Sequence, residues 1–206
     1  MRVFLSAGEP SGDHHAALLC KSIKDQCPEA VCVGLGGPKM ESAGCKLIAD
    51  MTHLAVMWFF RVLAKVHCFV DLARRAERSF LDDRPDVCVL VDFPGFHWWL
   101  AWRAKRHGIP VVFYCPPQIW AWASWRIHKM RRLIDHVLSA LPFEHEWFAS
   151  QGVSSTYVGH PFFDVRHTPE KRVKQIARSS PVSSTHLPCN AETSDVRPVW
   201  IKIYLK

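Results

Sequence analysis

The sequence predicts an α/β domain with a Rossmann-like, doubly wound parallel sheet. Two observations carry this prediction. Short apolar runs bounded by turn residues alternate with amphipathic segments along residues 1–165. The first of these runs also passes directly into the glycine- and proline-containing stretch SAGEPSGD at residues 6–13. Parallel strands need a crossover connection, usually a helix, so repeated strand-then-helix order is typical of a parallel sheet with helices on both faces. We therefore expect a single domain over residues 1–165.

The apolar runs and the segments between them predict the elements in order. Strands are expected at MRVFLSA, AVCVGLG, DVCVLVDF, PVVFYC, HVLSAL and STYVG. Helices are expected over residues 12–26, about 53–81, 98–107, about 120–133 and 143–151. The alternation stops near residue 164. Residues 166–206 are basic and then rich in Ser, Thr and Pro, so we expect a poorly ordered tail, with the last eight residues a candidate isolated strand.

Composition narrows the class of protein. The 206 residues are 49% hydrophobic, which is enough for a core. Eight cysteines are spread along the chain with no CxxC pair, a usage that favours buried thiols in a reducing compartment such as the cytoplasm. No apolar run is long enough to span a membrane, and the chain does not begin with a signal segment. The net charge of +7 favours an anionic partner, whether nucleic acid, phospholipid headgroups or a phosphorylated substrate.

The stretch SAGEPSGD places polar side chains where the first strand meets the first helix. Ligands of open parallel sheets bind at the carboxyl ends of the strands, so Glu9, Ser11 and Asp13 are expected to face a crevice. Helix capping by Ser11 or Asp13, with Gly8 at positive φ, is an equally good explanation of those residue types. The stretch lacks GxGxxG spacing, and Glu9 would repel a pyrophosphate, so a nicotinamide-dependent enzyme is disfavoured.

Asp92 is the second acidic candidate. It ends the apolar run CVLV and precedes Phe93 and Pro94, so the backbone must turn there and leave the carboxylate at the edge of the sheet. A carboxylate in that place suits a general base. A turn-forming or helix-capping aspartate is the alternative interpretation.

Seven strings together resemble one family. They are AGEPSGD, GLGGPKMESAGC, LAVM, VDFPGFH, PPQIWAW, LPFE and VGHPFFD. In order and spacing they are similar to the N-terminal half of the lipid-A-disaccharide synthase family, over residues 1 to about 165. The resemblance implies the GT-B architecture, in which two Rossmann-like domains face each other across a cleft, with this chain forming the acceptor side.

The resemblance also implies a reaction. It is the inverting, metal-independent transfer of a sugar from UDP-2,3-diacylglucosamine to 2,3-diacylglucosamine 1-phosphate in lipid A biosynthesis, without a cofactor. The family's donor domain has no counterpart here, since a tail of about forty residues is too short for a nucleotide-binding domain. We therefore expect the isolated chain to be inactive. A non-catalytic remnant or lipid-binding domain, and another GT-B enzyme such as a UDP-sugar epimerase, are the alternatives.

Site roles follow from the resemblance together with the strand-end positions. Asp92 is expected to act as the general base or to orient it, and Glu9 to hold the acceptor sugar. Substrate-binding side chains or backbone are expected at Ser11, Gly12, His97, Trp120, Trp122 and His160. Burial is the default interpretation of the tryptophans, and a hydrogen bond within its loop is an equally good explanation of His160. No nucleic-acid motif appears, and His14 and His15, as helix neighbours, do not form a metal pair.

A stripe in the predicted helix 53–81 suggests a membrane surface. Its apolar residues share one face of the helix, and Arg61 and Lys65 lie around the other side. The expected membrane-facing residues are Trp58, Phe59, Val62, Leu63 and Val66. A core-facing stripe would show the same spacing. The acylated substrates implied by the resemblance favour peripheral, salt-sensitive association with the anionic inner face of the cytoplasmic membrane.

Overall fold

A computed structural model of the chain describes residues 1–52 and 66–161. The strands of this part form one parallel sheet in the order β3-β2-β1-β4-β5-β6-β7. Their bounds are β1 Arg2–Ala7, β2 Val31–Gly36, β3 Lys46–Asp50, β4 Val87–Val91, β5 Val111–Tyr114, β6 His136–Ser139 and β7 Ser155–Tyr157. The predicted doubly wound α/β class is thereby confirmed.

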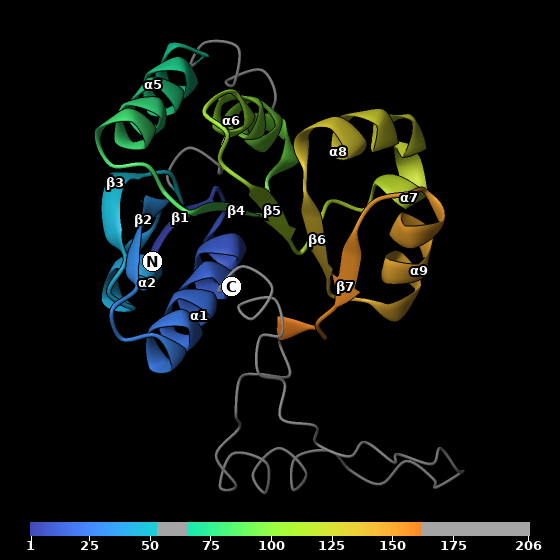
Figure 1. Ribbon diagram of the computed structural model, residues 1–206, viewed down its shortest axis with the longest axis horizontal. Coiled ribbons are helices and arrows are strands. Elements are labelled where there is room, and N and C mark those ends of the chain that lie inside the picture. The colour runs from blue at the N-terminus through green and yellow to red at the C-terminus, as the bar shows by residue number, and fades with distance from the viewer. Residues whose placement is uncertain (53–65, 162–206) are drawn as a thin grey trace, which may run out of the picture.

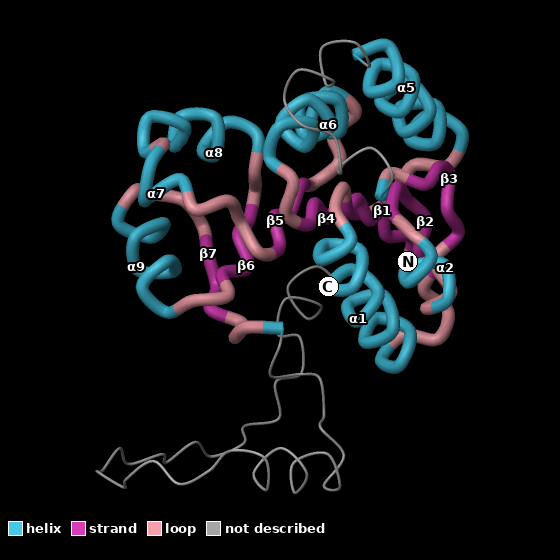
Figure 2. The backbone as a smooth tube through the Cα atoms, turned by 180° about the vertical axis from the view of Figure 1, so that it is seen from behind, coloured by secondary structure: helices cyan, strands magenta, loops and turns pink. Residues whose placement is uncertain are grey.

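Helices cover both faces of the sheet (Figures 1 and 2). Helices α1 Pro10–Gln26 and α2 Pro38–Ser42 lie on one face. Helices α5 Val66–Asp82, α6 Pro94–Arg106 and α8 Ile127–Leu133 lie on the other, and α9 Pro142–Ser150 packs against β6 and β7. The short helices α7 Ile119–Trp122 and η1 Ser124–Arg126 connect β5 to α8.

Two apolar cores follow from this arrangement, one on each face of the sheet. Phe4, Leu90 and Phe113 point toward α5, α6 and α8, while Leu5, Val89 and Val112 point toward α1. Strand β4 reads VCVLV and is buried along its whole length, as expected for a central parallel strand that is covered on both faces. The described cysteines are all free, and four of them are buried.

Several element bounds differ from those that the sequence predicts. Helices α1, α6 and α9 begin earlier than expected, each at a proline, because proline fits the first turn, where its missing N–H is not needed. Strand β3 and the five-residue α2 were not predicted. The expected helix at 120–133 is interrupted at Ala123, whose φ of −144° is not helical, and so divides into α7, η1 and α8.

Two further predictions fall partly or wholly outside the described residues. Of the helix predicted at about 53–81, the part from residue 66 onward is described, as α5. The predicted tail at 166–206 lies outside the described residues. Within residues 1–52 and 66–161, no helix is long and apolar enough to cross a membrane.

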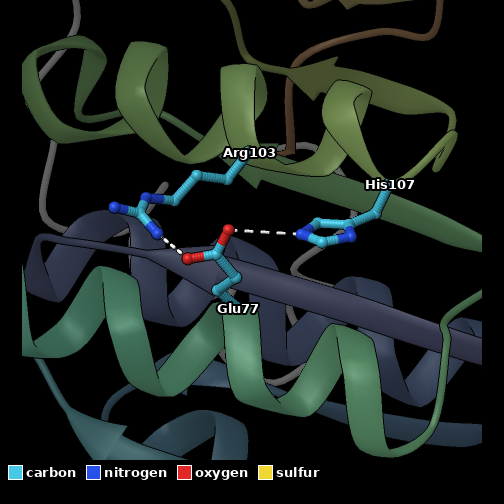
Figure 3. A network of polar contacts seen from close by, with 3 residues as sticks. All are labelled: Glu77, Arg103 and His107. Atoms are coloured by element: carbon cyan, nitrogen blue, oxygen red, sulfur yellow. Dashed lines mark hydrogen bonds and ion pairs between the residues drawn. The ribbon is translucent and has the colours of Figure 1, made fainter.

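A small polar network joins α5 to α6 (Figure 3). The Glu77 carboxylate on α5 pairs with the Arg103 guanidinium on α6, and its second oxygen lies 3.2 Å from His107 Nε2. The Arg103 guanidinium also lies 4.8 Å from the centre of the Trp99 ring. The network fixes how α5 lies beside α6 above the sheet.

Candidate functional site

The site begins at the point where the strand order reverses. The chain proceeds from β1 to β2 and β3 on one side and then returns to place β4 on the other side of β1. Ala7 at the end of β1 lies level with Val91 at the end of β4. Asp92 follows Val91 directly and Glu9 is two residues after Ala7, so the fold brings together the two carboxylates that the sequence analysis selected. Such a switch point is the usual ligand-binding crevice of an open parallel sheet.

The electrostatics of Glu9 reflect this proximity. Partial burial raises the pKa of the Glu9 carboxyl, and the neighbouring Asp92 carboxylate raises it further. Glu9 therefore keeps its proton to a higher pH than an exposed glutamate would, which lets it donate a hydrogen bond over a wider pH range.

The backbone at the ends of β4 and β5 is strained. Asp92, Phe93 and Cys115 have φ values of 54°, 51° and 52°, a left-handed region that non-glycine residues seldom adopt. The Asp92 N–H donates to the Tyr114 carbonyl at 3.4 Å, and the Phe93 N–H donates to Asp92 Oδ1 at 2.9 Å. Strain of this kind clusters at functional sites, where the surrounding structure must hold it in place.

His97 is part of the structure that holds the strained turn. Its ring is fully buried, its Nδ1–H donates to the Asp92 carbonyl, and its Nε2 lies 3.0 Å from Ser6 Oγ. Burial lowers the pKa of His97 to about 4, so the ring is neutral at pH 7 and Nε2 accepts a hydrogen bond from the Ser6 hydroxyl. The expectation that His97 touches substrate does not fit this placement, because its side chain has no exposed surface. Its contacts instead hold the backbone of Asp92.

Two glycines lie where the start of α1 meets the end of β4. A Cβ on Gly12 would lie 3.4 Å from the Val91 carbonyl oxygen and 3.8 Å from the Asp92 Cβ. A Cβ on Gly8 would overlap the Phe93 ring, at 2.3 Å from its Cγ. Ser11 is exposed in the first turn of α1. A Cβ at Gly12 would thus make ordinary van der Waals contacts, whereas the absence of a side chain at Gly8 is required for the Phe93 ring to lie where it does.

The expectation for Asp13 is wrong. Asp13 is 2% exposed and does not face a crevice. Its carboxylate oxygens accept hydrogen bonds from the backbone N–H groups of Gly37, Lys39 and Met40, at 2.9–3.1 Å, and so cap α2 rather than its own helix. The sequence shows a capping residue here but not which helix it caps, because the partner lies more than twenty residues away.

The candidate tryptophans lie on α7, which follows β5 at the same edge of the sheet. Trp120 is half-buried, and its indole N–H donates to Glu144 Oε1 at 3.1 Å. Trp122 is 64% exposed, and the Arg126 guanidinium lies 5.1 Å from the centre of its ring. His160 follows β7 and is half-buried. The two tryptophans therefore differ, since one is anchored and the other is open to solvent.

Three residues of this edge were missed by the sequence analysis. Burial raises the pKa of the Glu144 carboxyl, which the charge of His160 and the hydrogen bonds from Trp120 and Leu141 partly oppose. Burial, and to a smaller extent Asp92 and Glu144, raise the pKa of the Cys115 thiol to about 12. Burial lowers the pKa of His15, with His14 and His160 acting in the same direction and Asp92 against them.

These mutual effects place Glu9, His15, Asp92, Glu144 and His160 around one region at the carboxyl edge. The signal that could have found Glu144 is its position, since it lies in the first turn of the helix after β6, as Glu9 lies just after β1. Within the described part of the chain, no group of three potential ligands is arranged to hold a metal ion.

Most of the expected membrane-facing residues lie outside the described ones, namely Trp58, Phe59, Val62 and Leu63. Val66 begins α5 and is 48% exposed. Further along α5, Leu72, Ala73, Ala76 and Phe80 are buried against the sheet. The later part of the apolar stripe is thus a core face.

The family model and the most similar relatives that were found agree on one family. The family model described as lipid-A-disaccharide synthetase matches residues 3–185. The lipid-A-disaccharide synthase of Trichlorobacter lovleyi is 38% identical over 164 residues, which are 80% of this chain and 43% of that protein. That of Koribacter versatilis is 37% identical over 183 residues, 86% of this chain and 47% of that protein. The chain therefore spans less than half the length of these relatives.

Solved structures support the fold alone, because their sequence identities are low. A UDP-GlcNAc 2-epimerase from Neisseria meningitidis bound to UDP-GlcNAc has a TM-score of 0.56 at 12% identity, covering 86% of this chain and 54% of that one. A UDP-N-acetylglucosamine 2-epimerase from Rickettsia bellii has a TM-score of 0.55 at 13% identity, covering 87% and 49%. Half of each such enzyme matches, which agrees with a Rossmann-like half of a GT-B-like fold. From the family model and the relatives' identity, the chain belongs to the lipid-A-disaccharide synthase family.

Proposed function

We propose that this chain is the acceptor-binding half of a lipid-A-disaccharide synthase. The observation that carries the proposal is the pair of carboxylates, Glu9 and Asp92, at the switch point between β1 and β4. The proposed substrates are those that the family resemblance implies, a UDP-linked diacylglucosamine donor and a diacylglucosamine 1-phosphate acceptor.

Asp92 is the proposed general base. In the transfer, the acceptor hydroxyl oxygen forms a bond to the anomeric carbon of the donor sugar while the bond from that carbon to UDP breaks, and UDP leaves with the bonding electrons. The proton of the hydroxyl passes to the Asp92 carboxylate. The left-handed turn at Asp92, held by His97, fixes the direction of this carboxylate and so supports the role.

Glu9 and the far side of the edge are proposed to hold the acceptor. Glu9, with its raised pKa, donates or accepts a hydrogen bond to the sugar. The exposed ring of Trp122 offers an apolar face to the substrate, while Glu144 fixes Trp120 beside it. His160 lies close enough to Glu144 to influence its pKa, and together with Ser11 and the backbone of Gly12 it completes the proposed contacts.

The isolated chain is proposed to be inactive. It spans less than half of its relatives, and the remaining half would carry the donor contacts. Positioning two substrates supplies a large share of the rate of any such transfer. Incubation of the chain with both substrates should therefore give no disaccharide, and turnover without a partner would contradict this part of the proposal.

Replacement of the base tests the assignment in a complete enzyme of the family that carries this N-terminal half. Asp92→Asn should lower the transfer rate by about 100-fold or more, since loss of a general base costs on the order of 10²–10⁴. Asp25→Asn on the exposed end of α1 is the matched control and should leave the rate unchanged. A near-normal rate for Asp92→Asn would show that the base is another group.

We also propose peripheral contact with anionic membranes at the start of α5. The support is the exposure of Val66 and the aromatic and basic composition of residues 58–65. Vesicles containing anionic lipid should co-sediment with the chain at low salt and release it at high salt. Val66→Ser should weaken the association, and lack of co-sedimentation at low salt would contradict it.

A further inference from the structure

We propose that a hollow at the opposite end of the strands binds a phosphate-bearing ligand. The hollow has a volume of about 370 Å³ and lies between the second half of α5 and the amino ends of β1 and β3. Figure 1 shows α5 above the edge of the sheet that β3 forms. Its lining includes Arg2, Lys46, Arg75 and Arg78.

Two of these four cations have no acidic partner in the part of the chain that the structure describes. Arg2 pairs with Asp83, and Arg75 pairs with Asp71 at 2.8 Å. Lys46 and Arg78 form no ion pair with any carboxylate among residues 1–52 and 66–161, although Asp82 also lines the hollow. The unpaired ammonium and guanidinium create a local excess of positive charge in a concave surface, where the field is stronger than on a flat one.

Arg2 adds a donor without an acceptor. Its Nε is buried and has no hydrogen-bond partner within the described structure. A buried donor that loses water without gaining a partner costs about 1–3 kcal/mol. The Ser79 hydroxyl also lines the hollow. An anion with several acceptor oxygens can bind the exposed Arg78 and Lys46 together, and phosphate, like carboxylate, fits the fork of the arginine guanidinium while offering three acceptor oxygens.

The apolar residues that line the hollow favour a ligand that is larger than a phosphate ion and partly apolar. Val33 and Ile48, whose side chains pack with the core on the α5 face, line it together with Leu47, whose side chain packs with the core on the α1 face. The volume exceeds what a single phosphate ion fills and falls within the range of small-molecule sites. The shared chemistry is therefore a phosphate group that carries an apolar substituent, as in a free phosphate ester or a phospholipid headgroup.

This site is independent of the proposed transferase function. Asp92 lies after the carboxyl end of β4, whereas Arg2 and Lys46 are the first residues of β1 and β3, at the amino ends of parallel strands. No residue of the hollow takes part in the carboxyl-edge site. Failure of either proposal therefore leaves the other unaffected.

The test is a titration of the whole chain followed by NMR, at constant ionic strength set with chloride. Three probes are used: inorganic phosphate, butyl phosphate, and dihexanoyl phosphatidylglycerol below its critical micelle concentration. We expect saturable shifts of the Arg2 Nε–H and of amides in β3 and the second half of α5. Saturation with butyl phosphate identifies a soluble ester as sufficient, and saturation with the lipid alone identifies a headgroup as the source.

Charge-matched variants decide between a site and general attraction. Arg78→Ala and Lys46→Ala should each weaken binding by about tenfold, as loss of a charge-assisted hydrogen bond does. Arg74→Ala removes the same charge from the exposed surface of α5 outside the hollow and should bind as wild type does. All three side chains are exposed, so these variants should fold normally. Absence of saturation with every probe, or equal weakening by Arg74→Ala and Arg78→Ala, would overturn the proposal.

Discussion

His97 shows how one buried side chain can control a functional turn. It is fully buried, yet it bonds to the carbonyl of the residue that we propose as the base. The sequence places His97 five residues after Asp92 and cannot tell whether the ring points into the crevice or into the core. The hydrogen bond from Ser6, which lies 91 residues earlier on β1, holds the ring in the core.

The pKa of His97 predicts a dependence of stability on pH. Because the pKa falls from its ordinary value of 6.5 to about 4 on folding, the unfolded chain binds more protons between these pH values, and stability is lost as pH falls through this window. From pH 7 to pH 4, wild type should lose about 3 kcal/mol more unfolding free energy than His97→Gln.

Urea unfolding across this pH range measures the difference directly. If the variant does not fold, an NMR titration of the wild-type imidazole gives the same information, since the ring should remain neutral at pH 5. An imidazole that titrates near 6.5, or equal losses in both proteins, would contradict the prediction.

The cap that Asp13 forms on α2 predicts the effect of its removal on stability. Asp13→Ala would leave three backbone N–H groups at the start of α2 without their acceptor and should cost about 2 kcal/mol of unfolding free energy. Asp25→Ala, on the same helix but exposed, should change stability by less than about 0.5 kcal/mol. Equal effects of the two substitutions, measured by urea unfolding, would show that the cap contributes nothing.

At the scale of elements, α5 depends on α6 for its position. The Glu77 carboxylate joins Arg103 on α6 and His107 just after it, and both of these side chains are partly buried (Figure 3). Burial lowers the pKa of Arg103, so its charge is costly without Glu77. Glu77→Ala should cost about 2 kcal/mol, while Glu146→Ala on the exposed side of α9 should cost almost nothing.

Amide hydrogen exchange locates the effect of the Glu77 substitution. Protection should fall in α5 and in the facing part of α6 and stay unchanged in α1. Uniform loss of protection across the sheet would mean that Glu77 contributes only to global stability and does not position α5.

Most elements could be predicted, and the exceptions have physical reasons. The strands β1, β2, β4, β5 and β6 are apolar runs between turn residues, so their pattern is clear. Strand β3 reads KLIAD, is only half-buried at the sheet edge and carries a weak pattern. The helix predicted at 120–133 has the right apolar spacing on both sides of Ala123, and the spacing alone does not reveal the break.

At the scale of the whole molecule, the sheet order explains how much of the site could be predicted. The carboxyl ends of parallel strands share one edge, so Glu9 and Asp92 could be selected from their positions after strands. Glu144 and His15 belong to the same region through the hydrogen bond between Trp120 and Glu144 and through the charge of His160, which acts on both, and no local pattern shows either. The basic hollow was missed for the same reason, since its cations come from three separate elements.

The central proposal is that this chain, which spans less than half the length of its relatives, binds the acceptor at the carboxyl edge of the sheet beside Asp92. Titration of the chain with a short-acyl 2,3-diacylglucosamine 1-phosphate, followed by NMR, tests this most directly. We predict saturable shifts at the amides of Glu9, Asp92 and His160, and about tenfold weaker binding for Glu9→Ala. Absence of saturable binding, or shifts confined to residues away from the carboxyl edge, would contradict it.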